Sequence, residues 1–325
     1  MWTTNAPRDA RQPDVTADDD LPTAHPAINV APRHRYAPWR GGHGGVRMGL
    51  TPIDQRHWLV DPATIAPADA DLTTRLAEKC ALFAAQPADV YRELDTAATR
   101  AAVAELRAHV ERHVRAIRQW SDHATVPALV NAAFNVAEDL CVLLPAGTRA
   151  DPEGDYRLVA AALFAPSFWR IAEKLGAPLA VVHGPVTNLE ARIGPRIRAF
   201  LRQLQPGRVF TRGNWNLHIA PQRFHPGPDE WTQAQHLTAD NAGARLWIRC
   251  ERQTLMKLPD TGAIVFTILV FVERLDAVAD NLPLLADLWQ AFQAMPAAEQ
   301  ADRHLPQIGA ALHGWLTQVG ALGAR

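Results

Sequence analysis

Two long strand-like runs joined by a short turn constrain the fold of this chain more than any other feature. Residues 245–268, RLWIRCERQTLMKLPDTGAIVFTI, contain an alternating run, the turn PDTG at 259–262 and a second run that is almost wholly apolar. A short turn between neighbouring strands makes them pair antiparallel. The chain therefore contains a β-hairpin, and its second strand is apolar enough to lie centrally in a sheet.

The remaining pattern alternates between groups of helices and strands. Residues 138–145 and 156–166 predict a second hairpin, and 208–231, RVFTRGNWNLHIAPQRFHPGPDEW, predicts a long loop. Helical periodicity is strongest over residues 96–120. Shorter helical segments are expected near residues 72–83, 124–137, 167–176, 188–204, 282–295 and 308–319. Because single helices do not regularly separate the strands, we expect an α+β fold with an antiparallel sheet of four or more strands.

Composition excludes several classes of protein. The 325 residues include 33 Lys and Arg against 34 Asp and Glu, so no overall field favours nucleic acid or a membrane as a partner. No apolar run approaches 18 residues and no signal peptide is visible, so a cytoplasmic protein is expected. Three distant cysteines without a CxxC pair encode neither a zinc site nor a cysteine-ligated iron–sulfur cluster.

The chain divides into a tail and one domain. Residues 1–45 are rich in Pro, Asp, Thr and Arg and end in GGHGG, which predicts a mostly disordered tail. Residues 46–325 are expected to form a single domain.

His183 follows four apolar residues in LAVVHGPV and precedes Gly184 and Pro185. Such a histidine is either a core residue hydrogen-bonded to a backbone carbonyl or an axial ligand to haem iron. A haem ligand needs an apolar surround and a fixed ring orientation. Spacing alone favours the core interpretation.

Arg252 is the unusual residue of the first hairpin. Alternation places it on the same, mainly apolar, strand face as Ile248 and Cys250. A buried guanidinium cannot lose its charge and needs anionic partners. The partner is either a carboxylate of the chain or a ligand anion such as a haem propionate, and the candidate carboxylates are Glu251, Glu138 and Asp139.

Two further groups of polar residues have competing interpretations. The stretch TRGNWNLH, residues 211–218, could line a pocket or could be a loop that Trp215 fixes in place. His109 and His113 have the i, i+4 spacing of metal ligands, but a solvated helix face explains them better because no HExxH motif is present.

Five blocks in this order are similar to one known family: RMGLTPIDQRHWL, EDLCVLL, FAPSFWRIAEKLGAPLAVVHGPV, RGNWNLH and RCERQTLMKLPDTGAIVFTI. The chain resembles the haem-dependent oxidative N-demethylases, formerly a domain of unknown function, over roughly residues 46–295. The resemblance implies a PAS-like fold, an antiparallel sheet with packed helices that enclose a haem b. It departs from the family at Gly213, where members often have serine before Asn-Trp.

The resemblance also implies an activity. The chain would be the haem-binding monooxygenase subunit that uses O2 to convert a small secondary amine, such as dimethylamine, to a primary amine and formaldehyde. Electrons would come from NAD(P)H through a partner reductase with FMN and a [2Fe–2S] cluster, and a tetrahydrofolate-using subunit would take up formaldehyde. The alternatives are a haem-based PAS-like sensor and a haem-free binding subunit.

Carried over to this sequence, the resemblance implies the site residues. His183 is the expected iron ligand, and His218 is its rival. Arg252 is expected to meet a propionate or the substrate side of the haem, and Trp215 and Asn214 to lie beside the pocket. Arg252 and Trp215 are the expected catalytic residues. Glu251 and Gln253 point to the opposite face of their strand and are weaker candidates.

Overall fold

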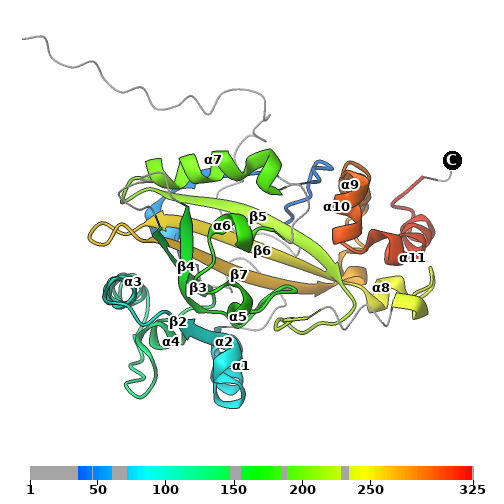
Figure 1. Ribbon diagram of the computed structural model, residues 1–325. Helices are drawn as coiled ribbons and strands as arrows, with labels where there is room; N and C mark the ends of the chain where they lie inside the picture. The colour runs from blue at the N-terminus through cyan, green and yellow to red at the C-terminus, as the bar shows by residue number, and fades with distance from the viewer. Residues whose placement is uncertain are drawn as a thin grey trace, which may run out of the picture.

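A computed structural model describes residues 36–45, 47–60, 72–146, 155–184, 189–227 and 234–323. Within these residues, seven strands form one sheet in the order β1-β5-β6-β7-β3-β4-β2, and all pairs are antiparallel (Figure 1). The strands are β1 (Thr51–Ile53), β2 (Tyr91–Glu93), β3 (Asp139–Pro145), β4 (Tyr156–Ala162), β5 (Val209–His218), β6 (Trp247–Lys257) and β7 (Ile264–Arg274). The predicted α+β fold with an antiparallel sheet is confirmed.

Both predicted hairpins are present. β6 pairs with β7 from Trp247–Arg274 to Lys257–Ile264, and β3 pairs with β4. The β6–β7 turn ends at Gly262, whose φ of +68° favours glycine. The Glu105 carboxylate accepts hydrogen bonds from the backbone N–H groups of Asp260 (2.8 Å) and Thr261 (2.9 Å), so a helix on one side of the sheet holds this turn.

Helices cover both faces of the sheet (Figure 1). On one face, called here the cavity face, lie α5 (Ile171–Lys174), α6 (Leu179–Val182) and α7 (Leu189–Gln203). The other helices of the described residues are α1 (Leu72–Ala85), α2 (Pro87–Val90), α3 (Ala97–Arg115), α4 (Ala128–Ala133), α8 (Ala242–Arg245), α9 (Leu282–Gln293), α10 (Ala297–Asp302) and α11 (Leu305–Gln318). Short 3₁₀ helices include Gln55–His57 and Leu275–Val278. No described helix has both the length and the apolar composition needed to cross a membrane.

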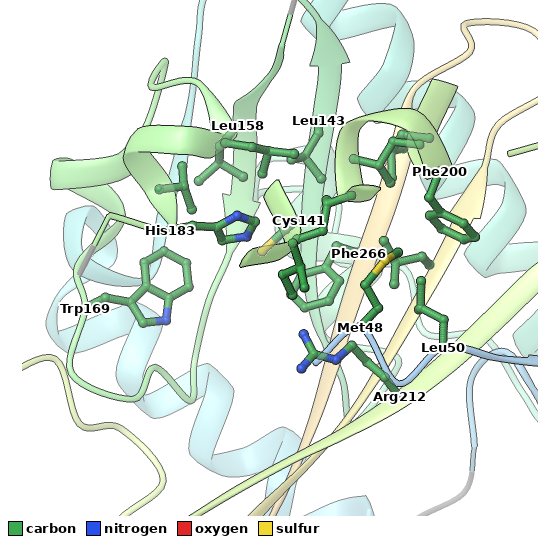
Figure 2. Close-up of a pocket in the computed structure, with 17 residues that line it drawn as sticks. Met48, Leu50, Cys141, Leu143, Leu158, Trp169, His183, Phe200, Arg212 and Phe266 are labelled. Carbon is green, nitrogen blue, oxygen red and sulfur yellow. The ribbon is translucent and has the colours of Figure 1, made fainter. Parts of the chain in front are cut away.

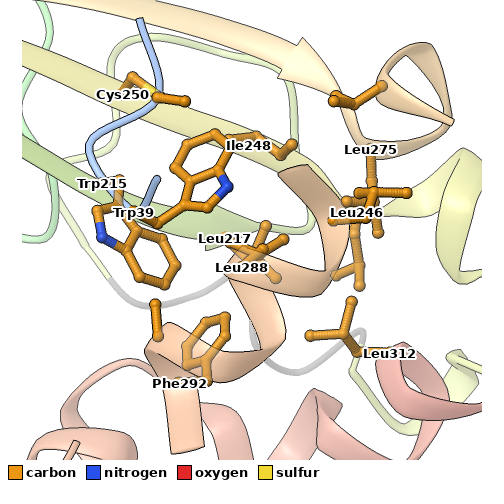
Figure 3. Packing of buried hydrophobic residues seen from close by; sticks show 14 of the residues in the cluster. Trp39, Trp215, Leu217, Leu246, Ile248, Cys250, Leu275, Leu288, Phe292 and Leu312 are labelled. Atoms are coloured by element: carbon orange, nitrogen blue, oxygen red, sulfur yellow. The ribbon is translucent and has the colours of Figure 1, made fainter. Parts of the chain in front are cut away.

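The opposite face carries the main hydrophobic core. α3 and α4 pack on one end of it. α9 and α11 pack on the other end, which Figure 3 shows. Trp215 of β5 lies at the second end, with its ring centroid 4.8 Å from Phe292 and 5.7 Å from Trp39. Alternation explains the division, because buried apolar side chains of β5 and β6 recur at every second position, whereas β7 is apolar on both faces.

Residues 36–45 of the expected tail pack against the domain, and Tyr36, Ala37 and Trp39 contact this core. Trp39 is buried, its indole N–H donates to the carbonyl of Leu284 (2.9 Å), and the backbone N–H of Gly41 donates to Asp287 (2.8 Å). The expectation of disorder is therefore wrong for residues 36–45, since two aromatic side chains, Tyr36 and Trp39, anchor a segment of loop-like composition. Residues 1–35 lie outside the described residues.

The predicted loop at residues 208–231 is wrong in its first half. β5 spans ten residues there and pairs with both β1 and β6. Its odd positions carry the buried apolar side chains of Val209, Trp215 and Leu217, while its even positions include Arg212 and Asn214. The polar residues at even positions made this stretch resemble a loop, although they also face protein rather than water.

The predicted helix at residues 167–176 is much shorter than expected. α5 comprises four residues, and Phe168 before it has a φ of +58°, which is incompatible with a right-handed helix. Gly176 follows it with a φ of +77°, a left-handed conformation that favours glycine.

Candidate cofactor site

A cavity lies between the cavity face of the sheet and helices α6 and α7 (Figure 2). Its volume is about 150 Å³, which is below the roughly 300–1,000 Å³ of typical ligand pockets. Most of its lining is apolar: Met48, Leu50, Cys141, Leu143, Leu158, Trp169, Leu179, Val182, Ile193, Ile197, Phe200, Leu201, Leu255, Ile264 and Phe266. The two strongly polar side chains that line it are His183 and Arg212.

His183 reaches the cavity from the end of α6. It is the C-cap of that helix, and its backbone N–H donates to the carbonyl of Leu179 (2.8 Å). Its imidazole has no hydrogen-bond partner among the described residues, so the core interpretation, which requires a bond to a backbone carbonyl, finds no support there. The predicted buried run is a short helix instead, and Val181 is 59% exposed.

The charge state of His183 suits a metal ligand. Burial lowers the pKa of its imidazole to about 4, and the nearby cations Arg212 and Lys174 act in the same direction. The ring is therefore neutral near pH 7, which is the form that binds iron.

Arg212 enters the cavity from β5 and was missed from the sequence (Figure 2). Its Nη2 donates to the carbonyl of Arg47 (3.3 Å), whereas its Nε is buried and has no partner among the described residues. Burial lowers the pKa of the Arg212 guanidinium, and the Glu251 carboxylate opposes this shift. A guanidinium with an open donor in an apolar cavity favours an anionic ligand group.

Arg252 lies on the other face of the sheet. The prediction that it shares a face with Ile248 and Cys250 is confirmed. Its Nη1 donates to the carbonyl of Trp58 (3.1 Å) and its Nη2 to that of His57 (2.5 Å). Backbone carbonyls thus accept from both of its terminal nitrogens, and the sheet separates Arg252 from the cavity that contains His183. The expected contact with a propionate stays a prediction.

Burial lowers the pKa of Arg252, and Glu138 opposes that shift, so Glu138 is the carboxylate that acts on it. Glu138 in turn accepts a hydrogen bond from the backbone N–H of Val60 (2.9 Å). Arg252 and Glu138 thus hold the segment that contains His57, Trp58 and Val60 against the sheet.

The other predicted site residues are distributed along β5. Trp215 lies in the core of the opposite face, outside the cavity. Asn214 lies on the cavity face but does not line the cavity, and its Nδ2 donates to Glu251 (3.2 Å). His218 lies at the far end of the strand, stacked on Phe168 with a centroid distance of 4.8 Å and an interplanar angle of 6°. Of the predicted site residues, the structure therefore places His183 in the cavity and the others elsewhere.

Glu251 and Gln253 face away from Arg252, as predicted, and that direction is the cavity face. Glu251 accepts hydrogen bonds from Gln253 (2.8 Å) and from Arg249 (3.4 Å). The same carboxylate opposes the lowered pKa of Lys174, which burial causes. Glu251 is therefore the counter-charge of a region rich in buried cations.

The histidine pair of α3 serves the packing of the helix. His113 Nε2 lies 3.1 Å from the carbonyl of Leu59, and its ring is edge-on to Trp58. His109 Nε2 lies 4.0 Å from Glu105. Among the described residues, no group of three or more His, Cys, Asp or Glu side chains is arranged to hold a metal ion.

Comparison with known families decides the membership. The family described as "Haem-dependent oxidative N-demethylase, alpha subunit-like" matches residues 106–313, which is more than half of the chain. The chain belongs to this family. The matched range contains β3 to β7 and both polar groups of the cavity, His183 and Arg212.

The cavity residues fit the group for which the oxidative N-demethylase family is named. A histidine-ligated haem needs apolar walls, a neutral imidazole for the iron and cationic groups for its carboxylates. The cavity offers apolar walls, the neutral ring of His183 and the open Nε of Arg212.

Proposed function

We propose that this chain is a cytoplasmic haem b subunit that oxidatively N-demethylates a small secondary amine such as dimethylamine. The supporting observation is the pairing of a neutral imidazole and an arginine with an open donor in one apolar cavity. Residues 46–325, extended by the packed segment 36–45, would form the catalytic domain, with the sheet and its helices in a PAS-like arrangement.

His183 would ligate the iron through its neutral ring, and Arg212 would hold a propionate. When bound, haem supplies the activation of O2. The overall reaction takes a secondary N-methylamine, O2, two electrons and two protons to the primary amine, formaldehyde and water. Electrons would come from NAD(P)H through a partner with FMN and a [2Fe–2S] cluster, and a tetrahydrofolate-using subunit would take up the formaldehyde.

The chain itself contributes binding, exclusion of water and charge. Leu143, Ile197 and Phe266 belong to apolar walls that keep water from the reacting groups. Trp169, rather than Trp215, is the tryptophan at the cavity, and the Lys174 ammonium lies 4.6 Å from its ring centroid. Burial lowers the pKa of His183, and the Arg212 and Lys174 cations act in the same direction, so the ring is unprotonated near pH 7.

A visible spectrum tests the proposal. Purified protein mixed with hemin should show a Soret band with one haem per chain, and dimethylamine should yield formaldehyde once a reductase is added. Absence of a Soret band after reconstitution would contradict the haem assignment. Haem binding without formaldehyde would point to the sensor instead.

A further inference from the structure

The cavity between the sheet and helices α6 and α7 has one charged side and one apolar side. The guanidinium of Arg212 lies at one side, and Leu143 and Leu158 lie at the opposite side (Figure 2). The rings of Phe200 and Phe266 add to the apolar wall. The cavity therefore suits a molecule with one anionic end and an apolar body.

The guanidinium of Arg212 has donors left for such an anion. Its Nη2 donates to the carbonyl of Arg47 (3.3 Å), and this is its one hydrogen bond within the described residues. Glu251, whose charge acts on Arg212, accepts instead from Gln253 (2.8 Å) and Asn214 (3.2 Å). Because a guanidinium carries five N–H donors and keeps its charge, an anion in the cavity would gain hydrogen bonds from it.

The size of the cavity limits the ligand. Its volume is about 150 Å³, and an apolar cavity of about this volume holds a molecule the size of benzene. A haem is several times larger, so its uptake requires the walls of the cavity to move apart. A compound with a small apolar body fits the cavity as it stands.

We propose that the haem-free chain binds a small apolar monocarboxylate of about six to eight carbons in this cavity. Its carboxylate meets the guanidinium of Arg212, and its apolar body lies against Leu143, Leu158 and Phe266. Hexanoate and benzoate are simple members of this class. The inference goes beyond the proposed function, because it concerns the cavity before any haem is bound.

Charge and geometry select a monocarboxylate among small amphipathic molecules. The planar fork of an arginine matches the two oxygens of a carboxylate. His183 adds no second cation, since burial lowers its pKa to about 4. The second negative charge of a phosphate monoester would therefore lie uncompensated among apolar groups, which is costly. An alkylamine would be repelled by Arg212.

A chain-length series tests the site. Haem-free protein is titrated calorimetrically with straight-chain monocarboxylates from butanoate to dodecanoate, and with benzoate. Each buried methylene group should strengthen binding about fourfold. The gain should end at about eight carbons, where the cavity is full. Alcohols and amines of the same chain lengths measure the contribution of the charge, and the carboxylates should bind more tightly than both.

Three variants locate the ligand. Arg212→Met removes the charge and keeps the wall apolar, so carboxylates should bind about tenfold or more weakly, while alcohols stay within about twofold of the wild type. The matched control, Arg208→Met, removes an exposed arginine and gives the same net charge, so it should bind carboxylates like the wild type. Ile197→Trp fills the cavity from α7 and should abolish binding of carboxylates and alcohols alike.

Urea unfolding of each variant separates a lost site from a lost fold. If Arg212→Met is unfolded, the comparison of carboxylates with alcohols in the wild type still decides the role of charge. The site would be overturned by absence of carboxylate binding, by equal affinities for carboxylates and alcohols, by a preference for amines, or by unchanged carboxylate binding in folded Arg212→Met. Carboxylate binding without haem uptake would contradict the proposed function alone, and haem uptake without carboxylate binding would contradict this site alone.

Discussion

The imidazole of His183 and the guanidinium of Arg212 reach one cavity from different walls, the first from the end of α6 and the second from β5. The two groups are coupled, because the Arg212 cation adds to the burial that lowers the pKa of His183 to about 4. The residue proposed to hold a propionate therefore also helps to keep the proposed ligand neutral.

Replacing the proposed iron ligand should change the spectrum of the reconstituted protein. His183→Ala should abolish or shift the Soret band, because the cavity then has no imidazole. His218→Gln should leave the band unchanged, since His218 lies outside the cavity. The reverse pattern would move the ligand to His218.

The two arginines of β5 and β6 should respond in opposite ways. Arg212→Met should weaken haem binding with little loss of stability, because it removes a buried charge with an open donor. Arg252→Met should leave haem affinity intact and lower the free energy of unfolding by about 2–4 kcal/mol, since two carbonyls lose their donor. Hemin titration and urea unfolding of both variants measure the two effects, and equal haem affinities in the two would contradict the assignment of Arg212.

Acid should destabilise the protein below the ordinary pKa of histidine. Burial lowers the pKa of His218 well below 6.5, with Arg249 acting in the same direction, and the pKa of His183 is lowered to about 4. As pH falls below about 6.5, the unfolded state takes up protons that the folded state does not, so stability decreases by up to about 1.4 kcal/mol per pH unit for each group. Urea midpoints should drop between pH 7 and pH 5, and the drop should be smaller in His218→Gln. An unchanged drop would show that other groups cause it.

Gly213 should be required for the packing of the N-terminal segment. A Cβ at this position would lie 2.7 Å from Cβ of Pro38 and 3.1 Å from the hydroxyl of Tyr36. Gly213→Ala should lower the free energy of unfolding by about 1–3 kcal/mol. The control is Gly309→Ala in α11, where the nearest side-chain atom is 3.5 Å away and alanine favours the helix. Comparable thermal midpoints for the two variants would contradict the close packing of the N-terminal segment on Gly213.

The sequence predicted the helices and strands in which the spacing of apolar residues matches the side that is buried. The β6–β7 hairpin, the long helix α3 and the strand face of Arg252 all follow from periodicity. The element order was enough to predict an antiparallel α+β fold. These features depend on residues close together in the chain.

The residues of the cavity could not be predicted from periodicity. Arg252 and Arg212 look equally suited to an anion in the sequence, and their difference depends on which face of the sheet α6 and α7 cover. Arg252 meets carbonyls about 195 positions earlier in the chain, a contact that no local pattern reports. Alternation along β5 could have indicated that Arg212 lies on one face of a sheet. The many polar residues of this stretch made it resemble a loop instead.

The N-terminal segment that packs through Tyr36 and Trp39 constrains how the protein can be made. The hydroxyl of Tyr36 donates to the carbonyl of Arg212 (3.0 Å), and Trp39 and Gly41 bond to residues of α9, about 245 positions later. A ribosome releases these partners long after the segment itself has emerged, and chains fold as their elements become available. The first residues that the structure describes therefore cannot pack on α9 until almost the whole chain has been synthesised.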